Sequence, residues 1–200
     1  MMEPEDSPVI HAIWIRAYHW VNAIAILIMT FSGWRIYNAS PLWDFRFPSD
    51  WTLGGWLGGA LQWHFAFMWV LVANTALYLL VNVFSGRLWS RFFPISPVEF
   101  IDNVKAVLTG RLAHNDLSRY NAVQRFAYVF VIVDLILIVL SGLVMWKSVQ
   151  FPVLRELLGG YEAARRIHFI CMAGLVAFFV VHVSMALMVP KTIVAMVRGR

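Results

Sequence analysis

Charged residues are scarce in this chain: they make up 14% of 200 residues, whereas hydrophobic residues make up 60%. A soluble globular domain of ordinary composition has about 25% charged residues. The mean hydropathy of +0.69 is also well on the apolar side. These values exclude an ordinary soluble protein and indicate an integral membrane protein.

Cysteine is almost absent as well. The single cysteine, Cys171, excludes an internal disulfide, and the lack of any Cys-x-x-Cys-His sequence excludes a covalently attached c-type haem. Any haem in this protein is therefore expected to be b-type. The net charge of +5 does not indicate a nucleic-acid partner, because the basic residues lie beside the apolar runs, where membrane topology accounts for them.

Long apolar runs are the main feature that the sequence does contain. Four of them reach the ~20 residues that a helix needs to cross the hydrocarbon core. They cover residues 11–37, 61–84, 122–147 and 166–189. The sequence therefore predicts an all-α integral membrane protein, a four-transmembrane-helix bundle surrounded by lipid that forms one domain over residues 1–200.

Two shorter segments carry helix signals outside these runs. Ser96-Pro97 followed by Glu99 is typical of a helix start, and apolar residues then recur at helical spacing until Gly110. This pattern predicts a short interfacial helix on the cytoplasmic side. Residues 152–158 are a weaker candidate of the same kind.

Basic residues favour one side of the membrane. Four spans place both termini on the same side as the long loop between the second and third runs, and that side has ten of the 16 Lys and Arg residues. The positive-inside rule makes this side cytoplasmic. Tryptophans gather on the opposite side, as in an aromatic belt at a lipid boundary. They are Trp34, Trp43, Trp51, Trp56, Trp63 and Trp146.

Four histidines lie well inside the apolar runs, where an ionisable side chain is costly and is expected to have a partner, whereas His11 lies at the membrane entrance. His168 and His182 are fourteen residues apart, over which a helix advances about 21 Å and turns about 1400°. Both therefore point the same way, near opposite membrane faces. His19 lies at the depth of His182, and His64 lies at the depth of His168.

Two opposed pairs are therefore predicted, one near the cytoplasm and one near the outside. His19 with His182, and His64 with His168, are each able to bind one haem iron through imidazole nitrogens, which predicts two b haems. The alternative is that each histidine only makes hydrogen bonds within the bundle. Zinc explains the pattern less well, because two imidazoles without a carboxylate or thiolate leave a zinc site incomplete.

Small and basic residues near the histidines fit the same interpretation. Glycines allow a flat macrocycle to approach a helix closely, although simple helix–helix contact is an alternative. The candidates are Gly33, Gly142 and Gly174. Arginines can pair with haem propionates, or can simply extend to the membrane interface. These are Arg16 near the inner pair, and Arg35, Arg165 and Arg166 near the outer pair.

Asp134 lies near the middle of the third run, among Val, Ile and Leu. A carboxyl group at that depth is costly unless it has a partner or a function. One role is a proton relay to a membrane substrate. The other, which we favour, is a structural hydrogen bond to Asn74, Asn22 or a buried water.

Together these residues resemble the bacterial di-haem cytochrome b membrane subunits of nickel-iron hydrogenases, formate dehydrogenases and thiosulfate reductases. The resemblance extends over nearly the whole chain, and the two histidines of the last run are its most specific part. The matching segments are Arg16 to Asn22 with Thr30 and Gly33, His64, Tyr120 to Arg125, and Arg166 to His168 with His182. The short chain is most similar to the thiosulfate reductase type.

The resemblance implies an electron-transfer subunit in the bacterial inner membrane, with both termini in the cytoplasm. Electrons would pass between a periplasmic oxidoreductase partner, of the molybdenum type, and the quinone pool. The resemblance also implies a quinone site at Asn121 and Gln124, beside Arg119 and Tyr120. The two amides can hydrogen-bond a quinone carbonyl, although a helix cap at the membrane surface is an alternative role.

Three other functions stay open at this stage. A stand-alone di-haem quinone oxidoreductase would act on a small diffusible redox molecule at the outer haem, which would make the chain an enzyme in its own right. A haem-free anchor would only hold a peripheral enzyme at the membrane. A metal or proton transporter is disfavoured, because the spans contain few acidic residues and no broken helix of the usual kind.

Overall fold

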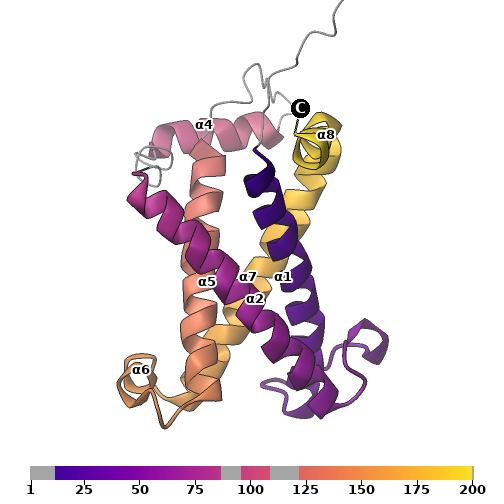
Figure 1. Cartoon of the computed structure of the whole chain (residues 1–200), viewed down its shortest axis with the longest axis vertical. Helices are drawn as coiled ribbons and strands as arrows, with labels where there is room; N and C mark the ends of the chain where they lie inside the picture. The colour runs from indigo at the N-terminus through magenta and orange to yellow at the C-terminus, as the bar shows by residue number, and fades with distance from the viewer. Residues whose placement is uncertain (1–11, 87–95, 109–121, 200) are drawn as a thin grey trace, which may run out of the picture. The chain divides into compact units, whose positions relative to one another are not determined.

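The computed structural model describes residues 12–86, 96–108 and 122–199, and within these ranges every regular element is helical. Four long helices correspond to the four apolar runs (Figure 1). They are α1 (Ile13–Ala39), α2 (Leu57–Phe84), α5 (Ala122–Trp146) and α7 (Tyr161–Met188). Each is long and apolar enough to cross a membrane. The predicted all-α fold with four candidate spans is confirmed.

Two of these helices begin earlier than the apolar runs. α2 starts at Leu57 rather than residue 61, and α7 starts at Tyr161 rather than residue 166. The first turn of α7 is charged, with a 3.1 Å ion pair between Glu162 and Arg165. An acidic residue near a helix N-terminus and an i,i+3 ion pair favour helix, but hydropathy alone does not register them.

Short helices lie outside the spans. α4 (Pro97–Leu108) begins where the Ser96-Pro97 signal predicts, and the Ser96 hydroxyl accepts a 3.4 Å hydrogen bond from the Glu99 backbone N–H. The segment after residue 151 forms α6 (Pro152–Leu157), and Ser49–Trp51 forms the 3₁₀ turn η1. Both predicted short helices therefore exist, and their position at the membrane interface stays a prediction.

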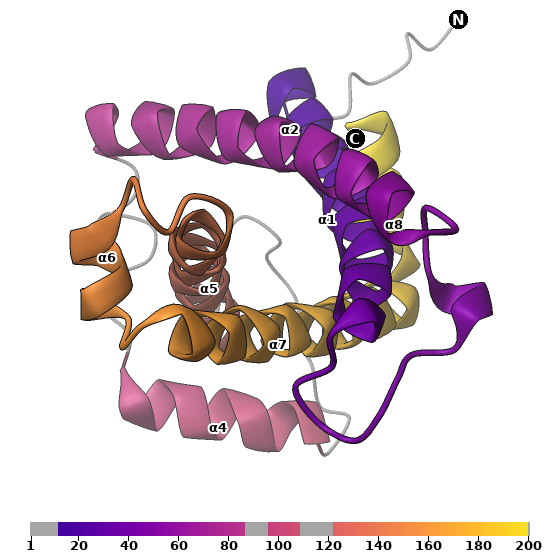
Figure 2. The ribbon, with the colours of Figure 1, turned by 90° about the horizontal axis from the view of Figure 1, so that it is seen from below.

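A further helix, α8 (Pro190–Arg198), was not expected from the sequence. α7 ends at Met188, and Pro190 occupies the first turn of the new helix, where its missing N–H costs nothing. Nine residues are too few to give a clear periodic pattern beside a long apolar run. Figures 1 and 2 show α8 turning away from the end of α7.

The chain forms two compact units. The first contains the residues up to Leu79 and those from Val181 onward, and the second contains Leu80–Val180. α2 and α7 each continue from one unit into the other. The organisation as one domain over residues 1–200 stays a prediction.

In the first unit, α1 and α2 are joined by polar contacts inside an otherwise apolar pair of helices. The Asn74 amide donates to the Asn22 side-chain oxygen at 2.9 Å and to the Tyr18 carbonyl at 3.1 Å. Beside this contact the rings of Tyr18 and Tyr78 stack at 4.4 Å. Buried amides in a membrane are expected to be satisfied by such interhelical hydrogen bonds.

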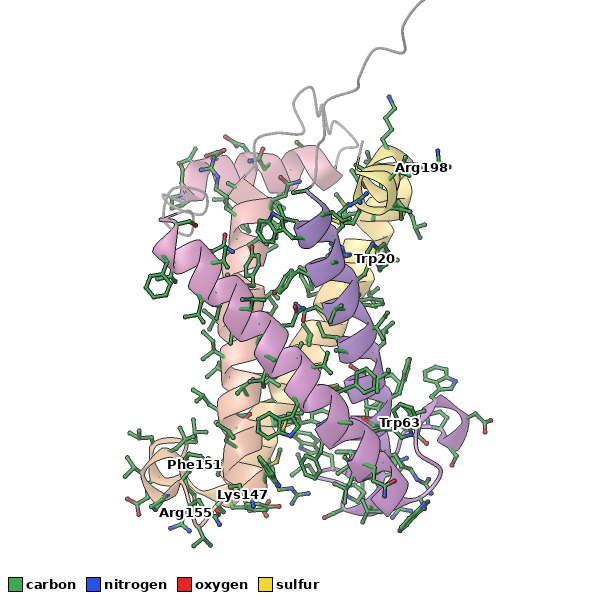
Figure 3. The ribbon with its side chains drawn as sticks, in the orientation of Figure 1. Trp20, Trp63, Lys147, Phe151, Arg155 and Arg198 are labelled. Carbon is green, nitrogen blue, oxygen red and sulfur yellow. The ribbon has the colours of Figure 1, made fainter. Side chains whose placement is uncertain are left out.

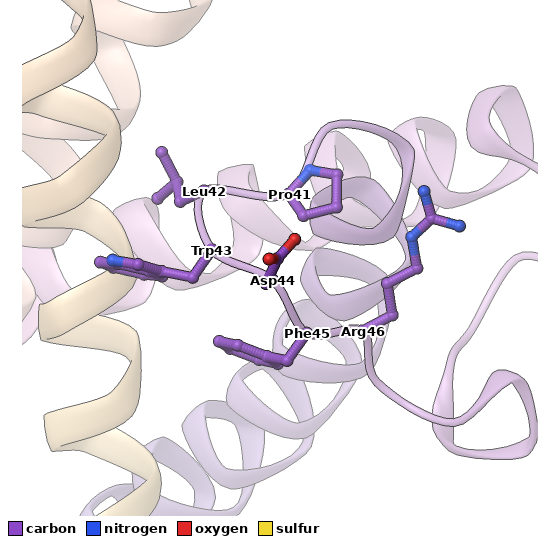
Figure 4. A pocket seen from close by; sticks show the side chains of 6 residues that line it. All are labelled: Pro41, Leu42, Trp43, Asp44, Phe45 and Arg46. Carbon is purple, nitrogen blue, oxygen red and sulfur yellow. The ribbon is translucent and has the colours of Figure 1, made fainter.

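The loop after α1 is tied back to that helix. Trp34 stacks on Phe47 at 4.5 Å, and the Asn38 amide both donates to the Phe47 carbonyl and accepts from its N–H. Figure 4 shows the segment before Phe47, where Trp43 and Phe45 extend to one side and Arg46 to the other. Their exposed aromatic rings agree with the predicted aromatic belt on this side.

In the second unit, α4 crosses the N-terminal end of α5, as Figure 1 shows. Phe100 and Phe126 make an edge-to-face contact there at 5.1 Å. Further along α5, the buried Asp134 faces Cys171 and Gly174 of α7. Large apolar residues such as Ile136 and Ile170 stay exposed on the same helices, as expected of surfaces that face lipid.

Candidate functional site

His19 and His182 lie opposite one another in the first unit. Their ring centres are 6.1 Å apart, and the ring planes are inclined by 51°. Two imidazoles that bind one iron from opposite sides, each nitrogen about 2 Å from the metal, have ring centres about 6 Å apart. The observed spacing therefore fits a pair of axial ligands to one haem.

The chain around His19 is fixed by α8. Arg16 donates from Nη1 to the Val197 carbonyl at 3.0 Å, and the Trp20 indole N–H donates to the Met196 carbonyl at 3.3 Å. Figure 3 labels Trp20 in α1. These carbonyls lie in the last turn of α8, where intrahelical partners are missing and a cation is favourable. α1 and α8 thus hold each other through Arg16 and Trp20.

Arg16 has one group that this contact leaves unsatisfied. Its Nε is buried and has no hydrogen-bond partner among the described residues. A buried guanidinium N–H without an acceptor is costly. A carboxylate of a bound group would satisfy it, which agrees with the predicted propionate role of Arg16.

His64 of α2 lies against α1 in the first unit. Its Nδ1 is 3.1 Å from the Met29 carbonyl oxygen and 3.1 Å from the Ser32 hydroxyl. A carbonyl oxygen can only accept, so Nδ1 carries the proton and donates it. The other nitrogen, Nε2, then keeps its lone pair and can bind a metal.

His168 of α7 has the same surroundings in the second unit, supplied by α5. Its Nδ1 is 3.0 Å from the Ile138 carbonyl oxygen and 3.1 Å from the Ser141 hydroxyl. The same argument places the proton on Nδ1 and the lone pair on Nε2. A hydrogen bond from one ring nitrogen to a backbone carbonyl is the usual arrangement for a histidine that binds metal through the other.

Each of the three glycines faces a side chain of a neighbouring helix, which agrees with the alternative of helix–helix contact and leaves their approach to a macrocycle a prediction. A Cβ on Gly33 would lie 3.4 Å from Cε1 of His64, and a Cβ on Gly142 would lie 3.3 Å from Cε1 of His168. Gly174 faces the Asp134 carboxyl, with a corresponding distance of 3.4 Å. Two of the glycines thus make room for imidazole rings, and the third makes room for a carboxyl group, so what each admits is a side chain of a neighbouring helix.

Asp134 is buried, and the thiol of Cys171 is within hydrogen-bonding reach of its carboxyl. The partners expected from the sequence were wrong in part, because Asn74 donates instead to Asn22 and to the Tyr18 carbonyl. The sequence shows that Cys171 follows His168 by three residues. It does not show that the face of α7 with Cys171 packs against Asp134. The contact agrees with a structural role for this carboxyl.

The remaining predicted residues lie at the ends of the spans or outside the described ranges. Arg35 is in the last turns of α1, Arg165 pairs with Glu162, and Arg166 is in the second turn of α7. Gln124 is in the first turn of α5. Their propionate and quinone roles stay predictions. Asn121, Tyr120 and Arg119, like His11 and His114, lie outside the described residues.

A metal site of another kind is not formed in the part of the chain that the structure describes. No three His, Cys, Asp or Glu side chains gather there in a way that could hold a metal ion. A structural zinc site needs four ligands and a catalytic one needs three from the protein. Haem differs, because the porphyrin supplies four ligands and leaves only two axial positions to the protein.

Sequence reasoning missed Ser32, Ser141 and α8. A usable signal for the two serines is the dipeptide Ser-Gly, which occurs once inside the first run, at Ser32-Gly33, and once inside the third, at Ser141-Gly142. The sequence did indicate the glycines but not the hydroxyls beside them. Only the packing of α1 on α2, and of α5 on α7, identifies the histidine that each dipeptide contacts.

Known proteins resemble the chain over almost all of its length. A family model described as "Prokaryotic cytochrome b561" matches residues 10–199. A protein of Azospira oryzae named "Putative protein-methionine-sulfoxide reductase subunit YedZ1" is 60% identical over 190 residues, which are 95% of this chain and 96% of that protein. The cytochrome b556(fdo) subunit of formate dehydrogenase from Escherichia coli K12 is 24% identical over 206 aligned residues, covering 99% of this chain and 87% of that protein.

Proposed function

Because this chain belongs to the prokaryotic cytochrome b561 family, we propose that it carries electrons between membrane quinone and a periplasmic oxidoreductase, using two b haems. At the level that the family establishes, the chain is a membrane electron-transfer subunit that binds haem b. It is a multi-pass bacterial membrane protein with four candidate spans. The number of haems, the quinone and the partner are our proposal.

The spacing of His19 and His182 carries the proposal. The 6.1 Å between their ring centres agrees with the distance of about 6 Å expected for two imidazoles that bind one iron. The buried Nε of Arg16, one helical turn from His19, supports an anionic group at the same place. These residues would hold the inner haem, with Arg16 at a propionate.

His64 and His168 would hold the outer haem. In each, the hydrogen bonds at Nδ1 place the proton there and keep the lone pair on Nε2, the nitrogen that would bind iron. Their pairing rests on the matching depths of the two histidines in the sequence. Bound haem would supply reversible one-electron transfer, while the protein contributes the axial ligands and surroundings of low polarity.

Quinone would bind at the cytoplasmic end, at Asn121 and Gln124, as the family resemblance implies. Gln124 stands in the first turn of α5, so its amide lies at the end of a span, where a quinone ring in the membrane can reach it. Protons released or taken up by quinone would exchange with the cytoplasm. The positive-inside rule supports the orientation, with both termini on that side.

The partner would be the catalytic subunit of a periplasmic reductase for methionine sulfoxide in proteins. This follows from the Azospira oryzae relative, which is 60% identical over 95% of the chain and carries that function in its name. A reductase draws electrons from the chain, so quinol is the donor. Quinol gives two electrons and two protons, and the sulfoxide takes two electrons and two protons to yield thioether and water. A molybdenum centre in the partner would perform that step.

A spectrum with haem quantitation tests the two haems. The purified chain should contain two b haems, and His64→Ala and His182→Ala should each lose a different one. His114→Ala, which changes a histidine between the second and third apolar runs, should keep both. A chain without haem, or loss of the same haem in both variants, would contradict the proposal. A chain without haem would favour the alternative function of a membrane anchor.

A separate experiment tests the partner. The chain would be purified in mild detergent from its native membrane together with whatever binds it, and quinol-dependent reduction of a methionine sulfoxide peptide would be measured. We expect turnover by the complex and none by a complex prepared with His182→Ala. A haem-replete complex that oxidises quinol only with another acceptor would show that the proposed substrate is wrong.

A further inference from the structure

We propose that Ser32 and Ser141 are positioning residues for His64 and His168, which fix Nδ1–H of each imidazole and thereby set the donor strength of Nε2 toward the iron. The inference rests on the proposed function, since it takes both histidines as haem ligands. It assigns to two buried hydroxyls an effect on the redox potential of one haem and not on that of the other.

The hydroxyl of Ser32 is fixed by its own helix. Its oxygen lies 2.7 Å from the Ile28 carbonyl and 3.2 Å from the Met29 carbonyl, so its single proton is donated within α1. Nothing remains for it to donate to His64. At 3.1 Å it therefore accepts the imidazole proton through a lone pair.

Ser141 repeats the arrangement on α5. Its oxygen lies 2.6 Å from the Leu137 carbonyl and 3.1 Å from the Ile138 carbonyl, and it accepts from Nδ1 of His168 at 3.1 Å. Both serine residues have no exposed surface. Water therefore cannot substitute for either hydroxyl without a rearrangement of the helix packing.

Each imidazole proton thus has two acceptors on one helix. For His64 they are the Met29 carbonyl and the Ser32 hydroxyl. For His168 they are the Ile138 carbonyl and the Ser141 hydroxyl. Acceptors at Nδ1 draw the proton away from the ring and make Nε2 a stronger donor. A stronger axial donor stabilises ferric iron and lowers the midpoint potential.

The glycine after each serine completes the arrangement. Gly33 and Gly142 lie against Cε1 of each imidazole, where a Cβ would come to 3.4 Å and 3.3 Å from that atom. The serine therefore holds one atom of the ring by hydrogen bonding, while the glycine lies beside the adjacent atom.

The same construction occurs independently in both compact units, with identical offsets. In each, the serine hydroxyl bonds to the carbonyl four residues earlier, and the histidine bonds to the carbonyl three residues before the serine. A third Ser-Gly dipeptide, Ser85-Gly86, provides a contrast within the chain. Its hydroxyl bonds to the Asn82 carbonyl at 3.4 Å, at the end of α2 and outside both histidine sites.

Redox titration of the haem-loaded chain, with low-temperature electron paramagnetic resonance, tests the proposal. Ser32→Ala and Ser141→Ala should keep both haems, and each should raise the midpoint potential of the same haem, the one lost in His64→Ala. The double variant should raise it further. The other haem should keep its potential, and Ser85→Ala should change neither.

Unchanged potentials in haem-replete alanine variants would overturn the inference, as would equal shifts in both haems. If an alanine variant fails to retain the outer haem, Ser32→Cys and Ser141→Cys decide, because a thiol is a weaker acceptor of similar shape. They should give a smaller upward shift, and no shift would overturn the inference. A wild-type chain without haem would instead contradict the proposed function, so the two failures are distinguishable.

Discussion

His19 and His182 approach within 6.1 Å between ring centres, although 163 positions separate them in the sequence. His182 stands in the last two turns of α7, and His19 stands in the second turn of α1. Both residues belong to the first compact unit, in which the two rings lie opposite one another. We therefore expect the two histidines to bind the same iron, which allows a prediction for either member.

Replacing His182 with methionine should leave the inner haem bound but change its potential. A thioether is a weaker donor than imidazole, and His/Met ligation raises the potential of a haem iron. We expect His182→Met to raise the midpoint potential of the haem that is lost in His182→Ala. The midpoint potential of the other haem should not change. The measurement is a potentiometric titration followed in the visible spectrum.

His19→Met should shift the same midpoint in the same direction. If the two methionine variants act on different haems, His19 and His182 do not share an iron. That result would refute the pair even in a preparation with two haems per chain.

Adding a methyl group at Gly33 or Gly142 should disturb the outer haem. In Gly142→Ala the new Cβ would lie 3.3 Å from Cε1 of His168, slightly closer than ordinary contact, whereas in Gly33→Ala it would lie 3.4 Å from Cε1 of His64, at the edge of ordinary contact, so the larger effect is expected at Gly142. We expect Gly33→Ala and Gly142→Ala to lower haem occupancy or alter the low-spin resonance signal of that haem.

Gly174→Ala is the matched control for this experiment. A Cβ there would meet Asp134 and Phe130 at a similar distance of 3.4 Å, so the cost of packing is comparable. It should therefore lower thermal stability without changing either haem signal. Equal loss of haem in all three variants would show that packing alone, and not contact with the histidine, is responsible.

The spans could be predicted from the sequence because they rest on a simple property, and the spacing of the histidines gives the predicted pairs in the same way. Apolar length fixes a membrane helix, and fourteen residues bring His168 and His182 back to one face. The last span was predicted correctly, although α7 begins at Tyr161 and the apolar run begins only at residue 166. The start was missed because hydropathy does not register a charged first turn.

The surroundings of the histidines could not be predicted in the same way. Whether Ser32 faces His64 depends on the orientation of α1 about its own axis relative to α2. A helix that is apolar on all sides has no periodic pattern that predicts this orientation. The partner of Asp134 was missed for the same reason, since Cys171 reaches it only through the packing of α5 on α7. Composition indicated that a carboxyl at this depth has a partner, but not which one.

Asp134→Asn should leave quinol oxidation and its pH dependence unchanged. The amide has the shape of the carboxyl, keeps one oxygen toward Cys171, and removes only the ability to transfer a proton. Turnover with a soluble quinol analogue, measured from pH 5.5 to 8.5 on a haem-replete variant, checks this. A fall in rate that grows with pH would instead support a proton relay.

Asp134→Leu is the companion variant, which removes the hydrogen bond as well as the charge. We expect only a small loss of stability, measured as a lower midpoint of thermal unfolding, because the thiol of Cys171 is a weak donor that loses its acceptor. Unchanged stability would contradict the structural role that the contact between α5 and α7 indicates.

Arg16→Gln should lower the potential of the inner haem. A cation beside a haem stabilises the reduced form, which carries one more electron, so removing the guanidinium favours the ferric state. An interaction of about 1 kcal/mol corresponds to a shift on the order of tens of millivolts for a one-electron couple. The shift should appear in the midpoint that is lost in His182→Ala.

Trp20→Phe separates this effect from the docking of α8. Arg16 and Trp20 both donate to the last carbonyls of α8, at 3.0 Å and 3.3 Å, so either change should weaken that contact by about 1 kcal/mol. Only Arg16 also has a buried Nε without a partner among the described residues. Trp20→Phe should therefore increase cleavage of the C-terminal helix by protease while leaving both potentials in place. If both variants lower the potential equally, α8 and not the charge of Arg16 controls the inner haem.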